Sequence, residues 1–212
     1  MDELRSLLPP PLQLVKKEGN RRCPQYTIFG YGRGSSSVNS VREALVEMGL
    51  IGKRSWEKWI PQQYLFASPA QRLSLLQGLL DTDGTVGKDN GDVSFTSTSQ
   101  QLADDCSFLV RSLGGKAYTR TRITKFTYKG VKKDGRRSWT VGISLPNFKL
   151  FRLLRKHVLC TQKMERTPNR ILVSVRPVGE EESVCISVDH PSKTYVTRDF
   201  IVTHNTTVGA VS

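Results

Sequence analysis

The sequence predicts an α+β fold, in which helices are interleaved with antiparallel strands, followed by a separate segment of short strands. Helix signals mark the apolar-periodic stretches at residues 40–49, 68–84 and 100–113. Residues 116–145 instead alternate between apolar and polar types over two long runs, as strands do when one face is buried. The last stretch, 171–205, alternates again and is expected to form short strands.

Length, charge and cysteine content limit the class of protein. The chain has 212 residues, of which 37% are apolar, enough for one or two compact cores. Lysine and arginine number 32 against 19 aspartate and glutamate, and the resulting charge of +13 favours nucleic acid as a partner over a merely soluble basic surface. We expect no membrane partner and a cytoplasmic location, because no apolar run approaches the roughly 20 residues of a span and no secretory signal is evident. The four cysteines form no CxxC pair, which argues against zinc and a disulfide framework.

Capping residues delimit the first two expected helices. Ser40 is expected to cap the helix at residues 40–49, which Gly49 ends. Ser68 and Pro69 open the second helix as N-cap and first helical residue. The apolar face of this second helix is expected to consist of Leu73, Leu76, Leu79 and Leu80.

Strands and helices are expected to alternate in the middle of the chain. A strand is expected at 93–99, a helix at 100–113 and a further helix at 147–157. Asp134-Gly135 is a turn signal within the long alternating stretch and predicts a hairpin there. Residues 161–170, rich in polar residues and proline, are interpreted as a linker.

Acidic residues close the second helix in a pattern that suits metal-assisted hydrolysis. The segment 76–84 reads LQGLLDTDG. Gly78 leaves room for a second helix to pack with its backbone close, and Gly84 permits a sharp exit. Two such helices side by side would bring Asp81 and Asp83 over one DNA duplex, where carboxylates can hold Mg²⁺ for phosphodiester hydrolysis. The alternative for this segment alone is a helix that happens to end in two acids before a glycine turn.

Segment 76–84 resembles the dodecapeptide motif of LAGLIDADG homing endonucleases, in the variant typical of inteins, and EKWIP at 57–61 is similar to the region that precedes it. The resemblance implies half of a homing endonuclease, with helices on a curved antiparallel sheet and Mg²⁺ as cofactor. It implies that Asp83 binds the metal, while Asp81 orders the helix end and can share the metal. Lys58 matches a basic position that stabilises charge at the scissile phosphate, although a solvated surface lysine explains it equally well.

Basic residues are concentrated in the long alternating stretch, with aromatic residues among them. From 116 to 137 there are nine lysines and arginines and one acid, Asp134. A twisted two-stranded ribbon of this charge can enter the major groove of double-stranded DNA, whereas a solvated hairpin does not need so uneven a charge. Because alternate residues of a strand share a face, Arg120, Arg122 and Lys132 are expected on one face of the ribbon and Lys133 on the other. The candidate DNA-binding residues are Lys116, Arg120, Arg122, Lys125, Lys129, Lys132, Lys133, Arg136 and Arg137.

The end of the chain carries residues suited to peptide-bond rearrangement. Residues 199–206, DFIVTHNT, resemble the C-terminal splice junction of inteins, and residues 185–197 resemble the motif that precedes it. The resemblance implies the last strands of an all-β Hint domain and a reaction without cofactor. The Asn205 side chain can attack its own carbonyl and release Thr206, with His204 as proton donor. The Thr206 hydroxyl can accept the N-terminal flank as an ester.

Cys185 departs from the family pattern, which usually has an aspartate there. With Thr203 directly before His204, it resembles inteins in which an internal cysteine attacks the N-terminal junction. That class also needs an upstream tryptophan motif that this chain lacks. Cys185 is therefore either the branching nucleophile or a small buried strand residue.

The resemblance divides the chain into four regions. They are the tail of a first endonuclease half (1–37), an endonuclease domain (38–160), a splicing segment (171–205) and a host flank (206–212). We expect both activities to need a missing N-terminal fragment, or a homodimer for the nuclease, with Met1 starting a split piece or a truncated gene. The two threonines after the junction suit a P-loop NTPase host. The alternatives are a DNA-binding module without catalysis and a decayed remnant.

Overall fold

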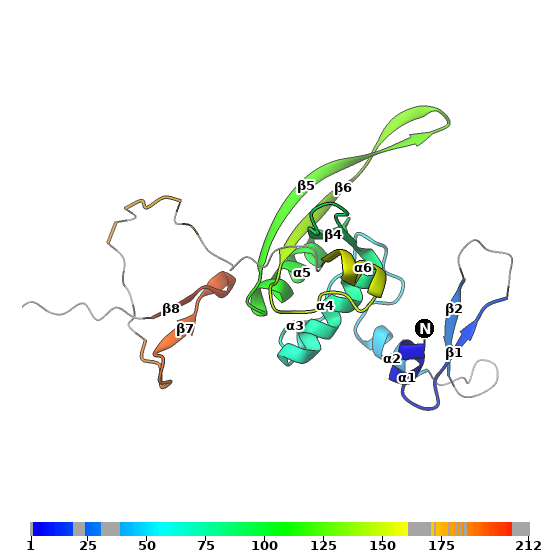
Figure 1. The fold of residues 1–212 in the computed structure, drawn as a ribbon, viewed down its shortest axis with the longest axis horizontal. Helices are drawn as coiled ribbons and strands as arrows, with labels where there is room; N and C mark the ends of the chain where they lie inside the picture. Colours follow the sequence, from blue (N-terminus) through cyan, green and yellow to red (C-terminus); the bar gives the residue numbers. More distant parts are fainter. Residues whose placement is uncertain are drawn as a thin grey trace, which may run out of the picture. The chain divides into compact units, whose positions relative to one another are not determined.

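The chain folds into two compact units, Met1–Arg54 and Ser55–Ser212, in the computed structural model (Figure 1). None of the described helices is both long enough and apolar enough to cross a membrane. The structure describes residues 2–18, 24–30, 39–160, 171, 173–177, 179–180, 182, 184 and 186–204.

The described part of the first unit contains a small hairpin and two helices. Its helices are α1 (Asp2–Leu7) and α2 (Ser40–Glu47), and its strands β1 (Gln13–Lys16) and β2 (Tyr26–Phe29) pair antiparallel. The N-cap of α2 is Asn39 and not Ser40, as the sequence had indicated. Asn39 has an extended backbone and its side chain accepts from the Arg42 amide at 3.0 Å, while Ser40 is already helical.

The second unit places helices on a four-stranded antiparallel sheet. Its helices are α3 (Gln62–Leu65), α4 (Pro69–Asp83), α5 (Gln100–Ser112) and α6 (Leu154–Cys160). The sheet has the order β3-β4-β6-β5, from β3 (Gly84–Val86), β4 (Val93–Ser97), β5 (Lys116–Tyr128) and β6 (Val131–Ser144). The expected helix start at Ser68 and Pro69 is confirmed, with a complete capping box between Ser68 and Gln71.

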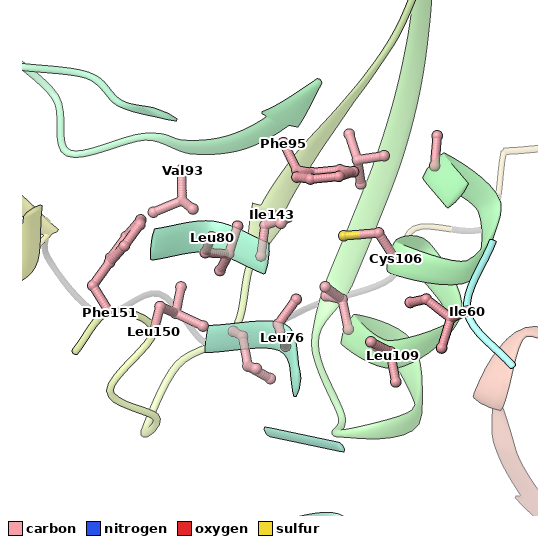
Figure 2. Close-up of a cluster of buried hydrophobic side chains, with 14 residues drawn as sticks. Ile60, Leu76, Leu80, Val93, Phe95, Cys106, Leu109, Ile143, Leu150 and Phe151 are labelled. Atoms are coloured by element: carbon pink, nitrogen blue, oxygen red, sulfur yellow. The ribbon is translucent and has the colours of Figure 1, made fainter. Parts of the chain in front are cut away.

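The core lies between α4, α5 and one face of the sheet (Figure 2). Leu76 and Leu80 of α4 are fully buried, and they pack with Phe95 of β4 and Val141 of β6. Each such side chain contributes about 1.5–3 kcal/mol through burial. The two leucines are the part of the expected apolar face that lies deepest in this core.

The long hairpin turns at Lys129-Gly130 and not at Asp134-Gly135. Both turn residues have positive φ, 49° and 78°, as a tight hairpin turn with the right twist requires. Gly135 instead lies inside β6, where the β5–β6 register shifts between Ile123 and Lys125. A Cβ on Gly135 would lie 2.5 Å from the Thr124 hydroxyl oxygen, so the glycine permits this bulge rather than a turn.

The helix expected at 147–157 begins later, at Leu154. Asn147 has φ of 67°, which is incompatible with a helix, and residues 145–153 follow an irregular path. Within that path Leu150 and Phe151 are inserted into the core, at 4% and 0% exposure. Burial of these two side chains therefore overrides the local helical pattern.

The last described strands are β7 (Thr194–Val196) and β8 (Val202–His204), which pair antiparallel and are joined through the 3₁₀ turn η2 (Arg198–Phe200). The other described residues from 171 to 193 lie in no helix or strand. Strands are thus confirmed for only part of 171–205. The expected linker at 161–170 lies outside the described residues.

Candidate metal centre and nucleic-acid interface

The acidic helix α4 ends abruptly because Gly84 fits where no larger residue can. Gly84 is extended, with φ −75° and ψ 151°, and its amide donates to the Leu80 carbonyl. A Cβ on Gly84 would lie 2.5 Å from that carbonyl oxygen. The glycine therefore provides space and not a left-handed conformation. Asp83, the last helical residue, is left exposed at this end.

Asp81 is engaged by the segment that leads into α6. Its two carboxylate oxygens accept the backbone amides of Arg152 and Leu153, each at 3.2 Å. The Arg152 guanidinium also donates to the Gln77 side chain at 3.0 Å and to Ser74 at 3.2 Å. These contacts fix the path of residues 152–153 against the end of α4.

Lys156 of α6 was not anticipated from the sequence, and it caps the same helix end. Its ammonium group donates to the carbonyl oxygens of Leu80, Asp81 and Gly84 at 2.8, 2.9 and 2.7 Å. A cation at the C-terminus of a helix also interacts favourably with the helix dipole. Burial, reinforced by the neighbouring Arg155 charge, lowers the pKa of Lys156.

Among the described residues at this helix end, one carboxylate is free to serve as a Mg²⁺ ligand. Mg²⁺ is usually held by one or two carboxylates together with water and phosphate oxygens. Asp83 offers an exposed carboxylate, whereas both oxygens of Asp81 already accept hydrogen bonds. Among the described residues, no cluster of three histidine, cysteine, aspartate or glutamate side chains could hold a metal.

One face of α4 is open to receive such a helix. An ideal Cβ on Gly78 would meet no atom within 4 Å. Thr82, one turn later, is exposed, and its hydroxyl donates to the Gly78 and Leu79 carbonyls at 3.0 and 3.1 Å. Both residues thus present a low surface, on which a second helix backbone can approach closely.

Lys58 lies on a loop that is fastened to the core. Its carbonyl oxygen accepts the Ser99 hydroxyl at 2.6 Å. The amide of Ile60 donates to the carboxylate of Asp105, which is buried in α5, at 2.8 Å. Desolvation raises the pKa of Asp105 above its usual range, although hydrogen bonds from the Ile60 amide and the Gln101 side chain act to lower it. The loop backbone is thereby held while the Lys58 residue itself is exposed.

The ribbon formed by β5 and β6 extends beyond the helices (Figure 1). Of the nine candidate DNA-binding residues, Lys116 at its base is half-buried and the other eight are exposed. Arg120 pairs with Thr140, next to the buried Val141, so Arg120 and Arg122 point away from the core. The bulge adds one residue to β6, which places Lys133 opposite Phe126. Lys133, and not Lys132, therefore shares the face of Arg120.

Aromatic rings hold several of these cations in place. The Arg136 guanidinium lies 3.4 Å from the centroid of the Trp56 ring, which belongs to the Lys58 loop. Arg120 lies 5.1 Å from the centroid of the Tyr118 ring. That ring lies across Gly142, where a Cβ would come within 2.2 Å of its Cζ atom. The ribbon thus presents oriented cations on its exposed surface.

The structure describes only part of the expected splice junction. Thr203 pairs with Tyr195 and the exposed His204 pairs with Thr194, in the β7–β8 hairpin. Cys185, Asn205 and Thr206 lie outside the described residues, so the roles assigned to them remain predictions.

Comparison with known proteins gives a family match to the acidic helix and ribbon. Residues 70–160 match the LAGLIDADG-like domain. The chain is 36% identical over 180 residues to the replicative DNA helicase DnaB of Mycobacterium intracellulare, covering 82% of this chain and 30% of that protein. It is 33% identical over 81 residues to the RecA protein of Mycobacterium tuberculosis, which is 36% of this chain and 10% of RecA. The chain therefore spans less than a third of the length of either relative.

Solved structures of the homing endonuclease I-DmoI also match. Mesophilic variants of that enzyme match at a TM-score of 0.38 and 12% identity, over 76% of this chain and 64% of theirs. A variant solved with its target DNA in the presence of magnesium matches at the same TM-score and identity, over 76% of this chain and 65% of that chain.

Proposed function

From the LAGLIDADG-like domain at residues 70–160, we propose that this chain is part of an intein and supplies half of a homing endonuclease that cleaves double-stranded DNA. The observation that carries the proposal is the end of α4. There Asp83 is exposed, while Lys156 binds the carbonyl oxygens of Asp81 and Gly84 on either side of it. An enzyme gains from a carboxylate whose position is fixed before the substrate arrives.

Asp83 would hold Mg²⁺ in this proposal, and Asp81 would contribute chiefly by ordering the helix end. The metal, when bound, would polarise the scissile phosphate and activate water. Lys58, on its fastened loop, would stabilise the negative charge that develops on the phosphate. Cleavage of both strands needs a second acidic helix. The open face of α4 at Gly78 suits one from a missing N-terminal fragment or from a second copy of the chain.

The ribbon would bind the duplex. Its exposed cations can neutralise phosphates, and the arginines on the face away from the core can reach base edges in the major groove. Arg120, held over Tyr118, is the best placed of them for a defined contact.

The splicing part of the proposal rests on the end of the chain and on the relatives. His204 and Asn205 follow strand β8 directly. The chain matches only 30% of a DNA helicase and only 10% of RecA. An intein inserted into two different host proteins would give such partial matches. In the proposed step the Asn205 side-chain nitrogen attacks its own carbonyl carbon, which forms a succinimide and breaks the bond to the Thr206 nitrogen. His204 donates the proton that the leaving nitrogen takes up, and the proton lost by the attacking side-chain nitrogen returns to His204.

Several further parts of the proposal follow from the same interpretation. In this interpretation Cys185 attacks the N-terminal junction, and Thr206 accepts that flank as an ester. The host would be a P-loop NTPase, and the protein would be cytoplasmic. The splicing steps would need no cofactor.

The nuclease proposal can be tested by separating binding from cleavage. A randomised duplex library is incubated with the protein and the N-terminal fragment, with Mg²⁺ or with EDTA. We expect Mg²⁺-dependent double-strand cleavage that Asp83→Asn abolishes without weakening binding in a gel-shift assay. The matched control is Asp89→Asn, at an exposed position on the loop between β3 and β4. Binding without cleavage by the unaltered protein, with any divalent metal, would indicate a DNA-binding module without catalysis.

The splicing proposal can be tested by intact mass. The purified protein is incubated alone and with the N-terminal fragment, beside an Asn205→Ala control. Loss of residues 206–212 with a succinimide or Asn terminus, absent in the control, is the expected result. An unchanged mass in both incubations would indicate an inactive junction.

A further inference from the structure

We propose that helix α5 is a docking surface for the hairpin of β7 and β8 and thereby holds the strand that ends at His204. Residues 55–160, which include α5, are called the nuclease-like lobe below. The contacts come from two neighbouring residues of η2, Asp199 and Phe200. The docking itself does not depend on the proposed function. Its consequence, that the lobe positions the residue before Asn205, rests on the proposed splicing role.

Aromatic rings make the apolar part of the contact. Phe108 of α5 meets Phe66 edge-on, with centroids 5.3 Å apart and an interplanar angle of 65°. Phe200 of η2 meets Phe108 in the same way, at 4.9 Å and 78°. These are the distances and angles that aromatic pairs prefer. Phe66 and Phe108 thus form a pair on the lobe to which the hairpin adds a third ring.

An ion pair makes the polar part. The Arg111 guanidinium lies 2.5 Å from a carboxylate oxygen of Asp199. The same guanidinium donates to the Ala117 carbonyl of β5 at 3.1 Å. Arg111 is therefore oriented by its own lobe, so little freedom is lost when Asp199 arrives.

The two residues on α5 and the two on η2 are each placed so that both contacts can form together. Phe108 and Arg111 are three residues apart in a helix and therefore lie on one face. Asp199 and Phe200 are adjacent, and both have left-handed backbone angles, φ 65° and 58°. Two consecutive non-glycine residues in this region are costly unless their surroundings favour them. The contacts with α5 provide such surroundings.

The hairpin itself is short. Strands β7 and β8 have three residues each, and an isolated hairpin of this size is not stable in water. The turn is closed by the Thr197 amide and hydroxyl, which both donate to the Ile201 carbonyl, at 2.9 and 3.1 Å. Val202, where β8 begins, lies two residues beyond Phe200. Fixing Phe200 therefore limits where His204 can lie.

A charge swap tests the docking without removing a buried side chain. Amide hydrogen exchange of residues 194–204 is measured by mass spectrometry in the full chain carrying Asn205→Ala, which prevents loss of the terminus. We expect Arg111→Asp and Asp199→Arg each to accelerate exchange by about fivefold to thirtyfold, and the double variant to restore protection. Lys88→Asp, which makes the same charge change as Arg111→Asp at an exposed position on the β3–β4 loop, should have no effect.

The proposal is overturned if either single variant leaves exchange unchanged, or if the double variant exchanges as fast as the singles. Unaltered exchange in α4 and β4 of every variant serves to show that the lobe stays folded. The consequence for splicing is measured separately, as release of residues 206–212 from chains with Asn205 intact that are incubated alone and with the N-terminal fragment. Restored protection without any release supports the docking and rejects the splicing proposal, whereas release at equal rates in protected and unprotected variants rejects positioning of His204 by the lobe.

Discussion

The Lys156 ammonium group lies 2.7 Å from the Gly84 carbonyl oxygen, directly after the helix that ends in Asp83. Two further carbonyl oxygens, those of Leu80 and Asp81, lie within 2.9 Å of the same nitrogen. One side chain from α6 thus satisfies the end of the acidic helix. The position of the candidate metal ligand depends on a residue about seventy positions later in the chain.

Replacing Lys156 by methionine should disturb both stability and the proposed site. The variant keeps the aliphatic stem but removes the ammonium donor from three carbonyl oxygens, of which only that of Leu80 also accepts the Gly84 amide. We expect a loss of about 1–2 kcal/mol in the free energy of unfolding, measured by urea titration. Mg²⁺-dependent cleavage should fall further than this loss explains, while DNA affinity stays unchanged. Lys149→Met, at an exposed position, is the matched control, and equal cleavage by the two variants would contradict a positioning role for Lys156.

Gly78 within α4 and Gly84 directly after it should respond in opposite directions to alanine. Gly84→Ala forces a Cβ to within 2.5 Å of the Leu80 carbonyl oxygen and should cost roughly 1–3 kcal/mol of stability. Gly78→Ala enters open space in a helix and should stabilise the isolated chain by about 0.5–1 kcal/mol. Thermal unfolding measures both. If a second helix packs at Gly78, this stabilised variant should also lose association with the N-terminal fragment in sedimentation experiments. Normal association would place the partner helix elsewhere.

Asp105 predicts a pH dependence of stability. Desolvation raises its pKa in the folded chain above the ordinary 3.8, so the folded state binds the proton more strongly than the unfolded state. Its contribution to stability is therefore greatest below pH 3.8 and is lost as pH rises through the folded pKa. Asp105→Asn retains an acceptor for the Ile60 amide and removes the titration. Relative to the unaltered chain, the variant should gain stability as pH rises across this window, in urea titrations at a series of pH values. A constant difference would contradict the assignment.

Tyr118 and Arg120 should contribute to DNA binding in different ways. Arg120→Ala removes one cation and should reduce the slope of log affinity against log salt by about 1. Gly142→Ala leaves the charge intact but displaces the Tyr118 ring, which Arg120 overlies. The salt slope should then be unchanged while discrimination between related duplexes weakens, as competition gel shifts would show. Arg176→Ala, an exposed position outside the ribbon, is the control for charge alone. A changed salt slope in Gly142→Ala would mean that the ring also orders phosphate contacts.

Local chemistry was enough to predict α4 and its acidic end. Ser68, Pro69 and Gly84 are each sufficient to start or stop a helix without help from distant residues. Strands β5 and β6 were likewise evident from alternation. The turn between them was placed wrongly because Asp134-Gly135 is the stronger turn signal, while Lys129-Gly130 meets the conformational need with a lysine at positive φ.

The partners of the site residues could not be predicted, since they depend on tertiary structure. Lys156, Arg152 and Asp105 form hydrogen bonds with residues that lie 45 to 78 positions away in the sequence. No local sequence pattern indicates these partners. The cross-strand partner of Tyr118 shows that a shift of one residue is enough to make such a prediction fail. Counting back from the Lys129-Gly130 turn would pair Tyr118 with Val141, whereas the bulge pairs it with Gly142. With the pairing wrong by one residue, the packing of the Tyr118 ring against Gly142 could not have been predicted.

The extra residue of β6 has an evolutionary consequence. Beyond the bulge, the side chains of β6 that share the outward face are those that would face inward in a regular ladder. Gain or loss of that single residue would exchange the outward set at the ribbon's tip, Lys133 for Lys132, without altering the base that packs on the helices. Insertion or deletion of one codon can thus change which lysine the ribbon presents at its tip, without altering the buried half of the sheet.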